Sequence, residues 1–250
     1  MPTHSEPQAG SGLHAEGRAG TARSRVEAFL AIGAYLGVAL FALRNIFAAP
    51  SSLLAHPGSL LPFVQLVHLD RWDLQMVIST MVRNAELWLS RPWDLFADVG
   101  QCFPMPAAHT LGEPMFGLGL LAAPVWALSK NPITSFNFVL LLTLWIPGVT
   151  MYFLARHFTR SFPAAFVAGL AFALVPARLL DPSHPYVHGD FWAPAVLLFL
   201  HRLFSRGRLR DVLGLAAFAS LAMLESIYPL LSTTLIAAIY SVHLLSLIHI

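Results

Sequence analysis

Long apolar runs separated by short polar stretches dominate the pattern of the chain. About 20 consecutive apolar residues cross the hydrocarbon core of a bilayer as a helix, so such runs predict transmembrane helices. Candidate spans are 26–48, 134–156, 162–179, 190–206, 211–228 and 229–250. The pattern therefore predicts an all-α polytopic membrane protein with about six transmembrane helices.

Composition agrees with a membrane protein. The 250 residues are 56% hydrophobic and 11% charged, whereas soluble domains carry about 25% charged residues. The basic residues are almost all arginine and form no tract suited to nucleic acid, so nucleic acid is not an expected partner. The single cysteine, Cys102, excludes an internal disulfide.

The two ends of the chain differ from its centre. Residues 1–24 are rich in Gly, Ala, Ser and Pro, which predicts a disordered tail before a membrane domain that covers 25–250. A signal peptide is the rival interpretation, but the apolar run from Val26 exceeds the 7–15 residues of such a segment and favours an uncleaved span. The last run stops without a polar cap, so we expect a C-terminally truncated piece of a longer protein.

Arginine positions predict the orientation, because short cytoplasmic loops carry an excess of Lys and Arg. With the N-terminus cytoplasmic and 114–129 not crossing, the arginines of 156–160 and 202–210 all lie inside. The acidic loops 49–133 and 180–190 then lie outside. If 114–129 crossed, both arginine clusters would move outside, so we interpret this segment as re-entrant or interfacial. The expected location is the inner membrane of a bacterium.

The outer loop 49–133 is too long for a simple connector and is predicted to contain helices. One apolar stripe has spacings of 4, 3, 4 and 3, which indicates one face of a helix: Leu74, Ile78, Met81, Ala85 and Trp88. Trp72, Trp88 and Trp93 are typical of a helix that lies in the membrane interface.

This topology gathers polar side chains on the outer face: Asp70, Asp73, Glu113, Asp181, His184, His188 and Asp190. His184 and His188 have the spacing of two metal ligands on a helix, but Pro185 between them argues against a regular helix. If a divalent ion is bound, carboxylates such as Asp73 and Glu113 suit Mg or Mn better. Glu225, near the outer end of its span, is a functional candidate because an acid within a span is expensive.

Several stretches together carry a family resemblance. After one span and a long outer loop come FPMPAAHTLGEPMFGLGLLAAPVWAL, NPITSFNFVLLLTLWIPGVTMYFLARHFT and WAPAVLLFLHRLF. This order resembles bacterial membrane glycosyltransferases of the GT-C type over residues 26–245. The resemblance implies a sugar donor on a polyprenyl phosphate, and an acid in the first outer loop that acts as base or metal partner. Such enzymes often place this acid close behind the first span, whereas here it follows a longer loop.

The resemblance also implies roles for individual residues. Asp73 best fits the acid that activates the acceptor hydroxyl, and Asp70 is the second choice. His184 and Arg178 would steady the leaving phosphate, while Glu113 would orient substrate or a metal ion.

Each role has a structural alternative. Asp73 could be a solvated charge, His184 and His188 polar loop residues, and Glu113 a cap at the start of segment 114–129. Trp192 could stack on a sugar or belong to the aromatic belt.

The expected function is transfer of a sugar from a polyprenyl-phosphate donor to a glycan, lipid or protein acceptor at the outer face. The alternative is a non-catalytic transporter or flippase-type protein for a lipid-linked or polar solute, with acids inside its spans. A third possibility is a fragment with no activity of its own.

Overall fold

A computed structural model describes residues 10–54, 71–96 and 112–248, and the regular structure within these ranges is helical. The α-helices are α1 (Gly10–Ala42), α2 (Arg71–Ser90), α3 (Phe116–Ser129), α4 (Pro132–Thr159), α5 (Phe162–Ala173), α6 (Pro176–Leu180), α7 (Ala193–Arg206), α8 (Leu209–Glu225) and α9 (Ile227–Ile248). Short 3-10 helices are η1 (Arg44–Ala48), η3 (Pro92–Asp94) and η5 (Gly189–Trp192). The all-α prediction is confirmed. Helix α1 begins inside segment 1–24, for which composition predicts disorder.

Within the described ranges, four helical segments are long and apolar enough to cross a membrane: Ala22–Ala42, Pro132–Thr159, Phe162–Leu180 and Ile227–Ser246. They are what an integral membrane protein requires, but the prediction of about six spans is wrong. Helices α7 and α8 have 14 and 17 residues. At 1.5 Å per residue they reach about 21 and 26 Å, less than the roughly 30 Å of a hydrocarbon core.

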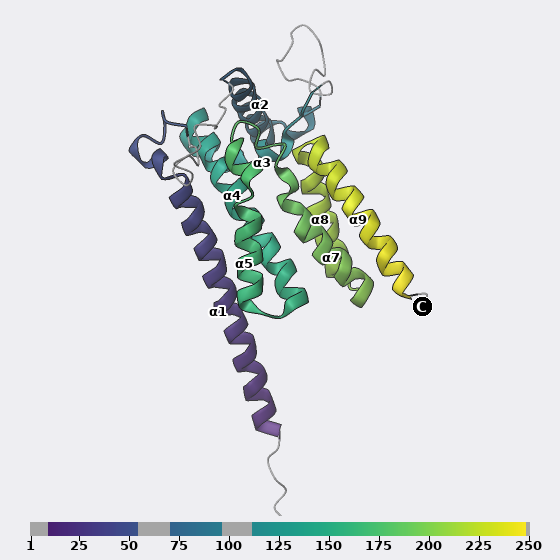
Figure 1. Cartoon of the computed structure of the whole chain (residues 1–250). Coiled ribbons are helices and arrows are strands. Elements are labelled where there is room, and N and C mark those ends of the chain that lie inside the picture. The colour runs from purple at the N-terminus through teal and green to yellow at the C-terminus, as the bar shows by residue number, and fades with distance from the viewer. Residues whose placement is uncertain (1–9, 55–70, 97–111, 249–250) are drawn as a thin grey trace, which may run out of the picture.

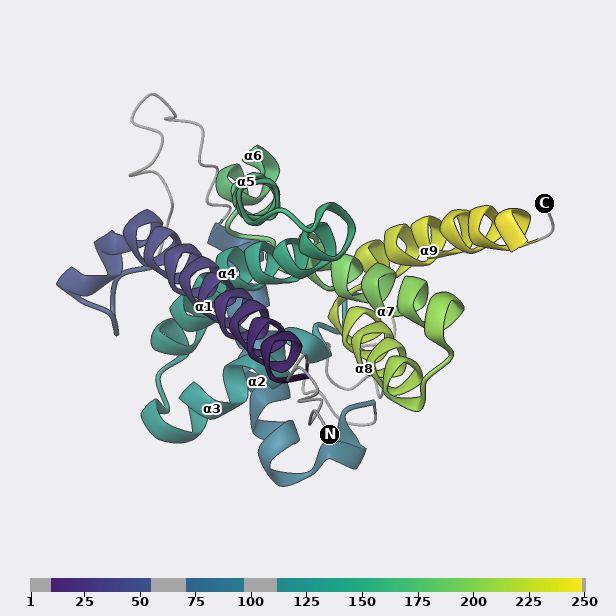
Figure 2. The same cartoon turned by 90° about the horizontal axis from the view of Figure 1, so that it is seen from below.

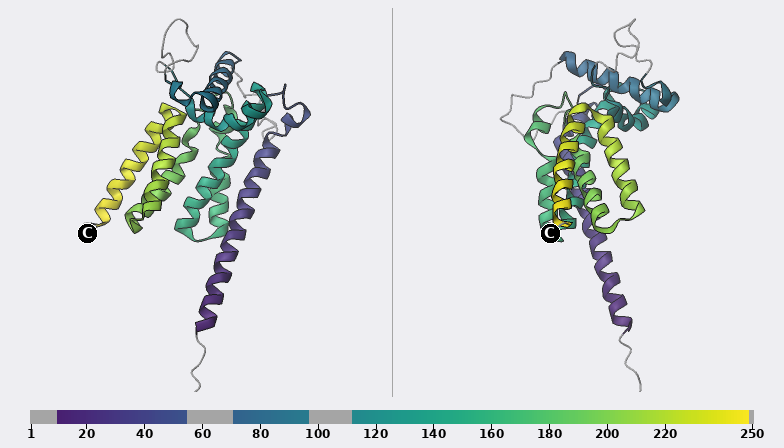
Figure 3. Two further views of the ribbon diagram at one scale, coloured as in Figure 1. Left: turned by 180° about the vertical axis from the view of Figure 1, so that it is seen from behind. Right: turned by 90° about the vertical axis from the view of Figure 1, so that its right-hand side faces the viewer.

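The helices form two groups that run side by side, one of α1, α4 and α5 and the other of α7, α8 and α9 (Figures 1 and 3). Helices α2 and α3 lie across one end of both groups, which we call the α2–α3 end. The opposite end holds the α4–α5 and α7–α8 turns, and the N-terminal part of α1 extends beyond it. Seen along the bundle, α9 lies at the edge away from α1 (Figure 2).

We call this opposite end the arginine end, after Arg23, Arg156, Arg160, Arg202, Arg206, Arg208 and Arg210. Segment 114–129, expected not to span, forms the 14-residue helix α3 and lies beneath α2. Helix α7 runs away from the α2–α3 end and α8 returns to it. Helix α9 therefore starts at the α2–α3 end, as it would if the short α7–α8 hairpin were absent.

Local sequence explains where the long helices begin and end. Asn131 caps α4 by accepting a hydrogen bond from the backbone N–H of Thr134 at 2.8 Å, and Ser161 caps α5 in the same way. Both helices have proline in their first turn, where a missing N–H costs nothing. Helix α7 ends at Gly207, whose φ of 59° is strain-free for glycine.

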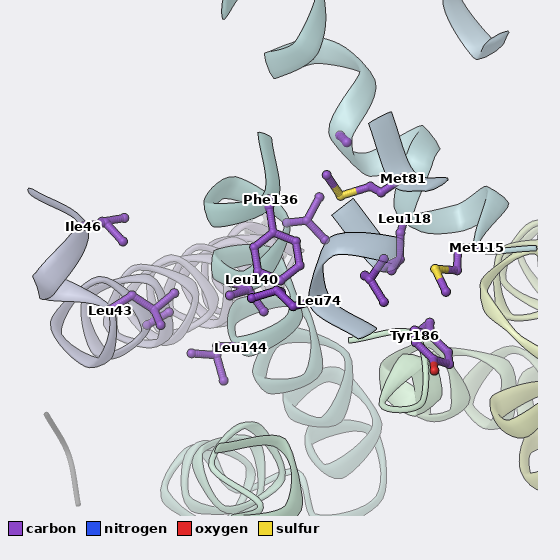
Figure 4. Packing of buried hydrophobic residues seen from close by; sticks show 14 of the residues in the cluster. Leu43, Ile46, Leu74, Met81, Met115, Leu118, Phe136, Leu140, Leu144 and Tyr186 are labelled. Atoms are coloured by element: carbon purple, nitrogen blue, oxygen red, sulfur yellow. The ribbon is translucent and has the colours of Figure 1, made fainter. Parts of the chain in front are cut away.

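The main core joins α2 and α3 to the parts of α1 and α4 that lie at the α2–α3 end (Figure 4). The predicted stripe on α2 is its buried face: Leu74, Met81 and Ala85 are buried, and Ile78 and Trp88 are partly buried against them. Burial of these apolar side chains is the main force that holds α2 on the end of the bundle.

A second contact fixes α1 on α4 and α5. Tyr35 donates a hydrogen bond from its hydroxyl to the carbonyl of Phe166 at 3.0 Å. A Cβ at Gly169 would lie 2.3 Å from this hydroxyl, and one at Gly148 would lie 2.9 Å from the ring. Glycine is therefore required at both positions for the three helices to approach this closely.

Candidate functional site

His184 forms the centre of a charged cluster at the α2–α3 end. Its Nδ1 lies 2.7 Å from Asp181 Oδ1, and its Nε2 lies 3.2 Å from Asp73 Oδ2. The two candidate catalytic residues, 111 positions apart in the chain, are thus in direct contact. His188 joins the edge of the cluster, with Nε2 4.0 Å from Asp181 Oδ2. We call these four residues the Asp–His cluster.

Helix α2 supplies Asp73 from its first turn, where the positive end of the helix dipole stabilises a carboxylate. Two hydrogen bonds fasten α2 to the start of α3: Asn84 Nδ2 donates to the carbonyl of Pro114 at 2.7 Å, and Trp88 Nε1 donates to that of Phe116 at 2.9 Å. Helix α3 also comes close to α2, because a Cβ at Gly119 would lie 2.3 Å from Asn84 Cβ. These contacts fix the position of helix α2, which carries Asp73 in its first turn.

Arg178 fastens the loop that carries His184. Its guanidinium pairs with Asp190 at 2.8 Å and donates to the carbonyls of Phe172 and Ala173 at the end of α5. With 4% of its side chain exposed, Arg178 bridges the two sides of loop 181–188 from within. It lies in the position of a structural anchor, and Asp190 already neutralises its charge.

The surroundings push the two histidines in opposite directions. Burial alone lowers the pKa of His184, but the hydrogen bonds and negative charges of Asp181 and Asp73 outweigh it, so the pKa is raised. Burial lowers the pKa of His188, and the positive charge of Arg178 lowers it further. His184 therefore favours the imidazolium form, in which both ring nitrogens donate to carboxylates, while His188 favours the neutral form.

Glu113 and Asp73 both act on Tyr186. Burial raises the pKa of Tyr186, and the negative charges of Glu113 and Asp73 raise it further. Glu113 Oε2 accepts a hydrogen bond from the backbone N–H of Ile227 at 3.3 Å. It therefore caps α9, whereas the capping alternative from sequence placed it on the start of α3. It also lines a pocket of about 290 Å³ with Ser226.

Trp192 is part of the interior, with only 8% of its surface exposed. Its Nε1 donates to Glu225 Oε1 at 3.2 Å. Glu225 is fully buried, and a Cβ at Gly117 would lie 2.5 Å from its carboxyl carbon. The sequence marks Glu225 as an acid inside an apolar run, but the contacts with Trp192 and Gly117 depend on how distant segments pack.

The site residues expected from sequence thus fall into three sets. Asp73, His184 and His188 come together, joined by Asp181. Glu113, Arg178 and Trp192 lie nearby but serve the ends of helices, the loop and the core. Asp70 lies outside the described residues. Among the described side chains, no group of three or more His, Cys, Asp or Glu is arranged to hold a metal ion, so they offer no ligand set for Mg or Mn.

The cluster has the parts needed for proton transfer. The side chain of Asp73 is 49% exposed, so a substrate hydroxyl can reach it, and His184 Nε2 contacts one carboxylate oxygen at 3.2 Å. Asp181 holds the opposite ring nitrogen and so fixes the orientation of the imidazole.

Comparisons with family models, with curated proteins and with solved structures gave no match. The four long apolar helices of the described residues and the contacts of His184 define the class: a helical integral membrane protein with a histidine–carboxylate cluster at one end.

Proposed function

We propose that the protein is a membrane glycosyltransferase of the GT-C type that uses a polyprenyl-phosphate sugar as donor. The single observation that carries this proposal is the contact between Asp73 and His184. The resemblance implies an acid in the first outer loop, for which Asp73 is the best fit, and a role for His184, and these two side chains meet. The two residues are 111 positions apart and belong to different elements, so local structure alone does not explain their contact.

The proposed step is a displacement at the anomeric carbon of the donor sugar. The acceptor hydroxyl gives its proton to Asp73 as its oxygen bonds to the anomeric carbon. The bond from that carbon to the phosphate oxygen breaks, and the electron pair leaves with the polyprenyl phosphate. His184, whose two ring nitrogens are held by Asp181 and Asp73, positions the carboxylate of the base. Arg178 acts through the loop that it anchors, as a positioning residue.

We further propose that the arginine end faces the cytoplasm of a bacterium, in accordance with the positive-inside rule. The Asp–His cluster then lies at the outer face of the inner membrane. A lipid-linked donor can enter a site at this depth sideways from the bilayer. The acceptor, whether a glycan, a lipid or a protein, approaches from the aqueous side.

A transporter or flippase-type protein is the second candidate. The observation that favours it is the full burial of two acids, Asp211 and Glu225, within the helical bundle, because buried acids in membrane helices often mark a path for solutes or protons. Asp211 pairs with Arg202 and Glu225 accepts from Trp192. Both therefore have a structural partner, and we favour the transferase.

The test is sugar release from radiolabelled polyprenyl-phosphate hexoses by the protein in proteoliposomes, with and without candidate acceptors. Loss of a general base costs roughly a hundredfold or more in rate, so Asp73→Asn should show this loss. Glu86→Gln removes an exposed acid from the same helix and should retain activity. Equal activity of wild type and Asp73→Asn would refute the proposal. Movement of intact labelled donor across the bilayer, without sugar release, would favour the transporter instead.

A further inference from the structure

A second charged pocket lies at the arginine end, remote from the Asp–His cluster. It has a volume of about 420 Å³ and is formed where the start of α1 meets the α4–α5 turn. Its charged lining consists of Arg23, Glu27, Arg156 and Arg160, and Ser24 and Ser161 add hydroxyl groups. Three positive groups thus face one negative group.

Glu27 organises two of these arginines. Arg23 Nε lies 3.1 Å from Glu27 Oε1, and Arg156 Nη2 lies 2.7 Å from Glu27 Oε2. Glu27 has only 14% of its side chain exposed, so the carboxylate holds both guanidinium groups from beneath. The Nε of Arg156 is buried and has no hydrogen-bond partner among the described residues.

Arg160 and the start of α5 complete the positive character of the pocket. The guanidinium of Arg160 makes no ion pair with a described residue. Arg160 is itself the left-handed residue that caps the end of α4. Ser161 caps the 12-residue helix α5, whose first turn lines the pocket. Its hydroxyl accepts from Ala164 and can still donate its own proton to an anion.

The surface of α1 beside the pocket is apolar and uncovered. Val26 and Leu30, which follow the pocket residues Arg23 and Glu27 by three positions on the helix, are 58 and 62% exposed. In a helix that is long and apolar enough to cross a membrane, such side chains face lipid. A ligand that binds here therefore meets arginines at its polar end and an apolar helix surface beside it.

We propose that this pocket binds the phosphate of an anionic phospholipid from the leaflet at the arginine end. Guanidinium groups bind phosphate through paired N–H donors, and basic pockets between membrane helices are suited to anionic headgroups. The exposed apolar face of α1 favours a phospholipid over free phosphate, because acyl chains can lie along it. This site is independent of the proposed transferase activity.

The experiment measures lipid binding to the purified protein by native mass spectrometry in detergent, with phosphatidylglycerol and phosphatidylcholine as probes. Arg23→Gln/Arg160→Gln leaves the Glu27–Arg156 pair intact and should lower phosphatidylglycerol affinity roughly tenfold or more, since each arginine adds attraction to an anionic lipid. Phosphatidylcholine binding should be weak and unchanged. Arg210→Gln, an exposed arginine at the same end but on the α7–α8 hairpin, is the matched control and should bind phosphatidylglycerol like wild type.

Each other outcome contradicts the proposal. Equal phosphatidylglycerol affinity of wild type and double variant would place the lipid elsewhere, and an equal loss in Arg210→Gln would show attraction to the whole end of the bundle. A third arm adds inorganic phosphate. If it protects the wild type against thermal unfolding but not the double variant, while neither lipid is retained, the pocket is a site for free phosphate.

Discussion

The α2–α3 end and the arginine end both carry charge, but they are built in different ways. At the α2–α3 end, His184 lies between two carboxylates whose side chains are 41 and 49% exposed. At the arginine end, the paired acids Glu27 and Asp211 have 14 and 0% of their side chains exposed, and their partners are arginines. The Asp–His cluster is open to solvent, whereas the acids at the arginine end are more enclosed and are paired with guanidinium groups.

The two ends should also differ in how much their ion pairs contribute to the free energy of unfolding. Exposed ion pairs contribute about 0.2–1 kcal/mol, while breaking a buried pair costs about 3–5 kcal/mol because it leaves a charge without a partner in a dry environment. Breaking the buried Arg202–Asp211 pair should therefore affect folding most, and substitutions in the Asp–His cluster should affect chemistry with little loss of stability.

The largest effect is expected for Arg202→Leu. Arg202 Nε lies 2.9 Å from Asp211 Oδ1, an ion-pair distance without hydrogen-bond alignment, and Asp211 is fully buried. The substitution should lower the free energy of unfolding by about 3–5 kcal/mol, measured by thermal unfolding in detergent. Arg208→Gln, an exposed arginine at the same turn, should unfold like wild type. If Arg202→Leu/Asp211→Leu does not recover most of the loss, the buried charge is not the cause.

A smaller effect is expected at the α2–α3 end for Gly117→Ala. The added Cβ would lie 2.5 Å from the carboxyl carbon of Glu225, so that carboxyl must move away from the Trp192 indole. Such overpacking costs about 1–3 kcal/mol, measured in the same unfolding assay. Gly112→Ala is the control, because its Cβ would meet nothing within 4 Å. Glu225→Ala should make room, so the double variant should lose less than the sum of the single losses; strict additivity would contradict this contact.

The helices could be predicted from the apolar runs. The distribution of arginine also predicted that the arginines gather at one end of the bundle and the Asp–His cluster lies at the other. The lengths of α7 and α8 could not be predicted in this way. The run 190–206 begins in the 3-10 turn Gly189–Trp192, and the run 211–228 is broken by Ser226, whose backbone is extended with φ −168° and ψ 164°. Apolar composition continues through both breaks, so a pattern of hydropathy alone overestimates the helix length.

The contacts within the site were likewise beyond the reach of sequence patterns. Asp73 and His184 were each expected to be functional, but a distance of 3.2 Å between residues 111 positions apart depends on how α2 packs on α3. Trp192 was expected at a membrane interface because tryptophan is common there. It is instead buried, since Glu225 accepts its N–H and Phe191 and Phe218 pack on its ring.

The smallest effect is a pH dependence of stability that comes from the two histidines of the Asp–His cluster. The pKa of His184 is raised in the folded protein, so its stabilising contribution is complete below the unfolded value of about 6.5 and is lost as pH rises through the folded value. The pKa of His188 is lowered, so its folded form resists protonation and costs stability as pH falls through the same region. Relative to wild type, His184→Gln should therefore be least stable at pH 6 and approach wild type at pH 9.

His188→Gln is the matched opposite of this test, because it should gain stability relative to wild type as pH falls from 9 to 6. Each change should stay below about 1 kcal/mol, since Asp73 and Asp181 are partly solvated. Unfolding followed by tryptophan fluorescence at pH 6, 7.5 and 9 measures both slopes. Arg23→Gln serves as the reference from the arginine end, because a guanidinium keeps its charge throughout this range, and it should show no slope relative to wild type. Slopes of the same sign for the two histidine variants would mean that the two histidines have similar electrostatic surroundings. The pH dependence of the α2–α3 end would then have to be assigned to other groups.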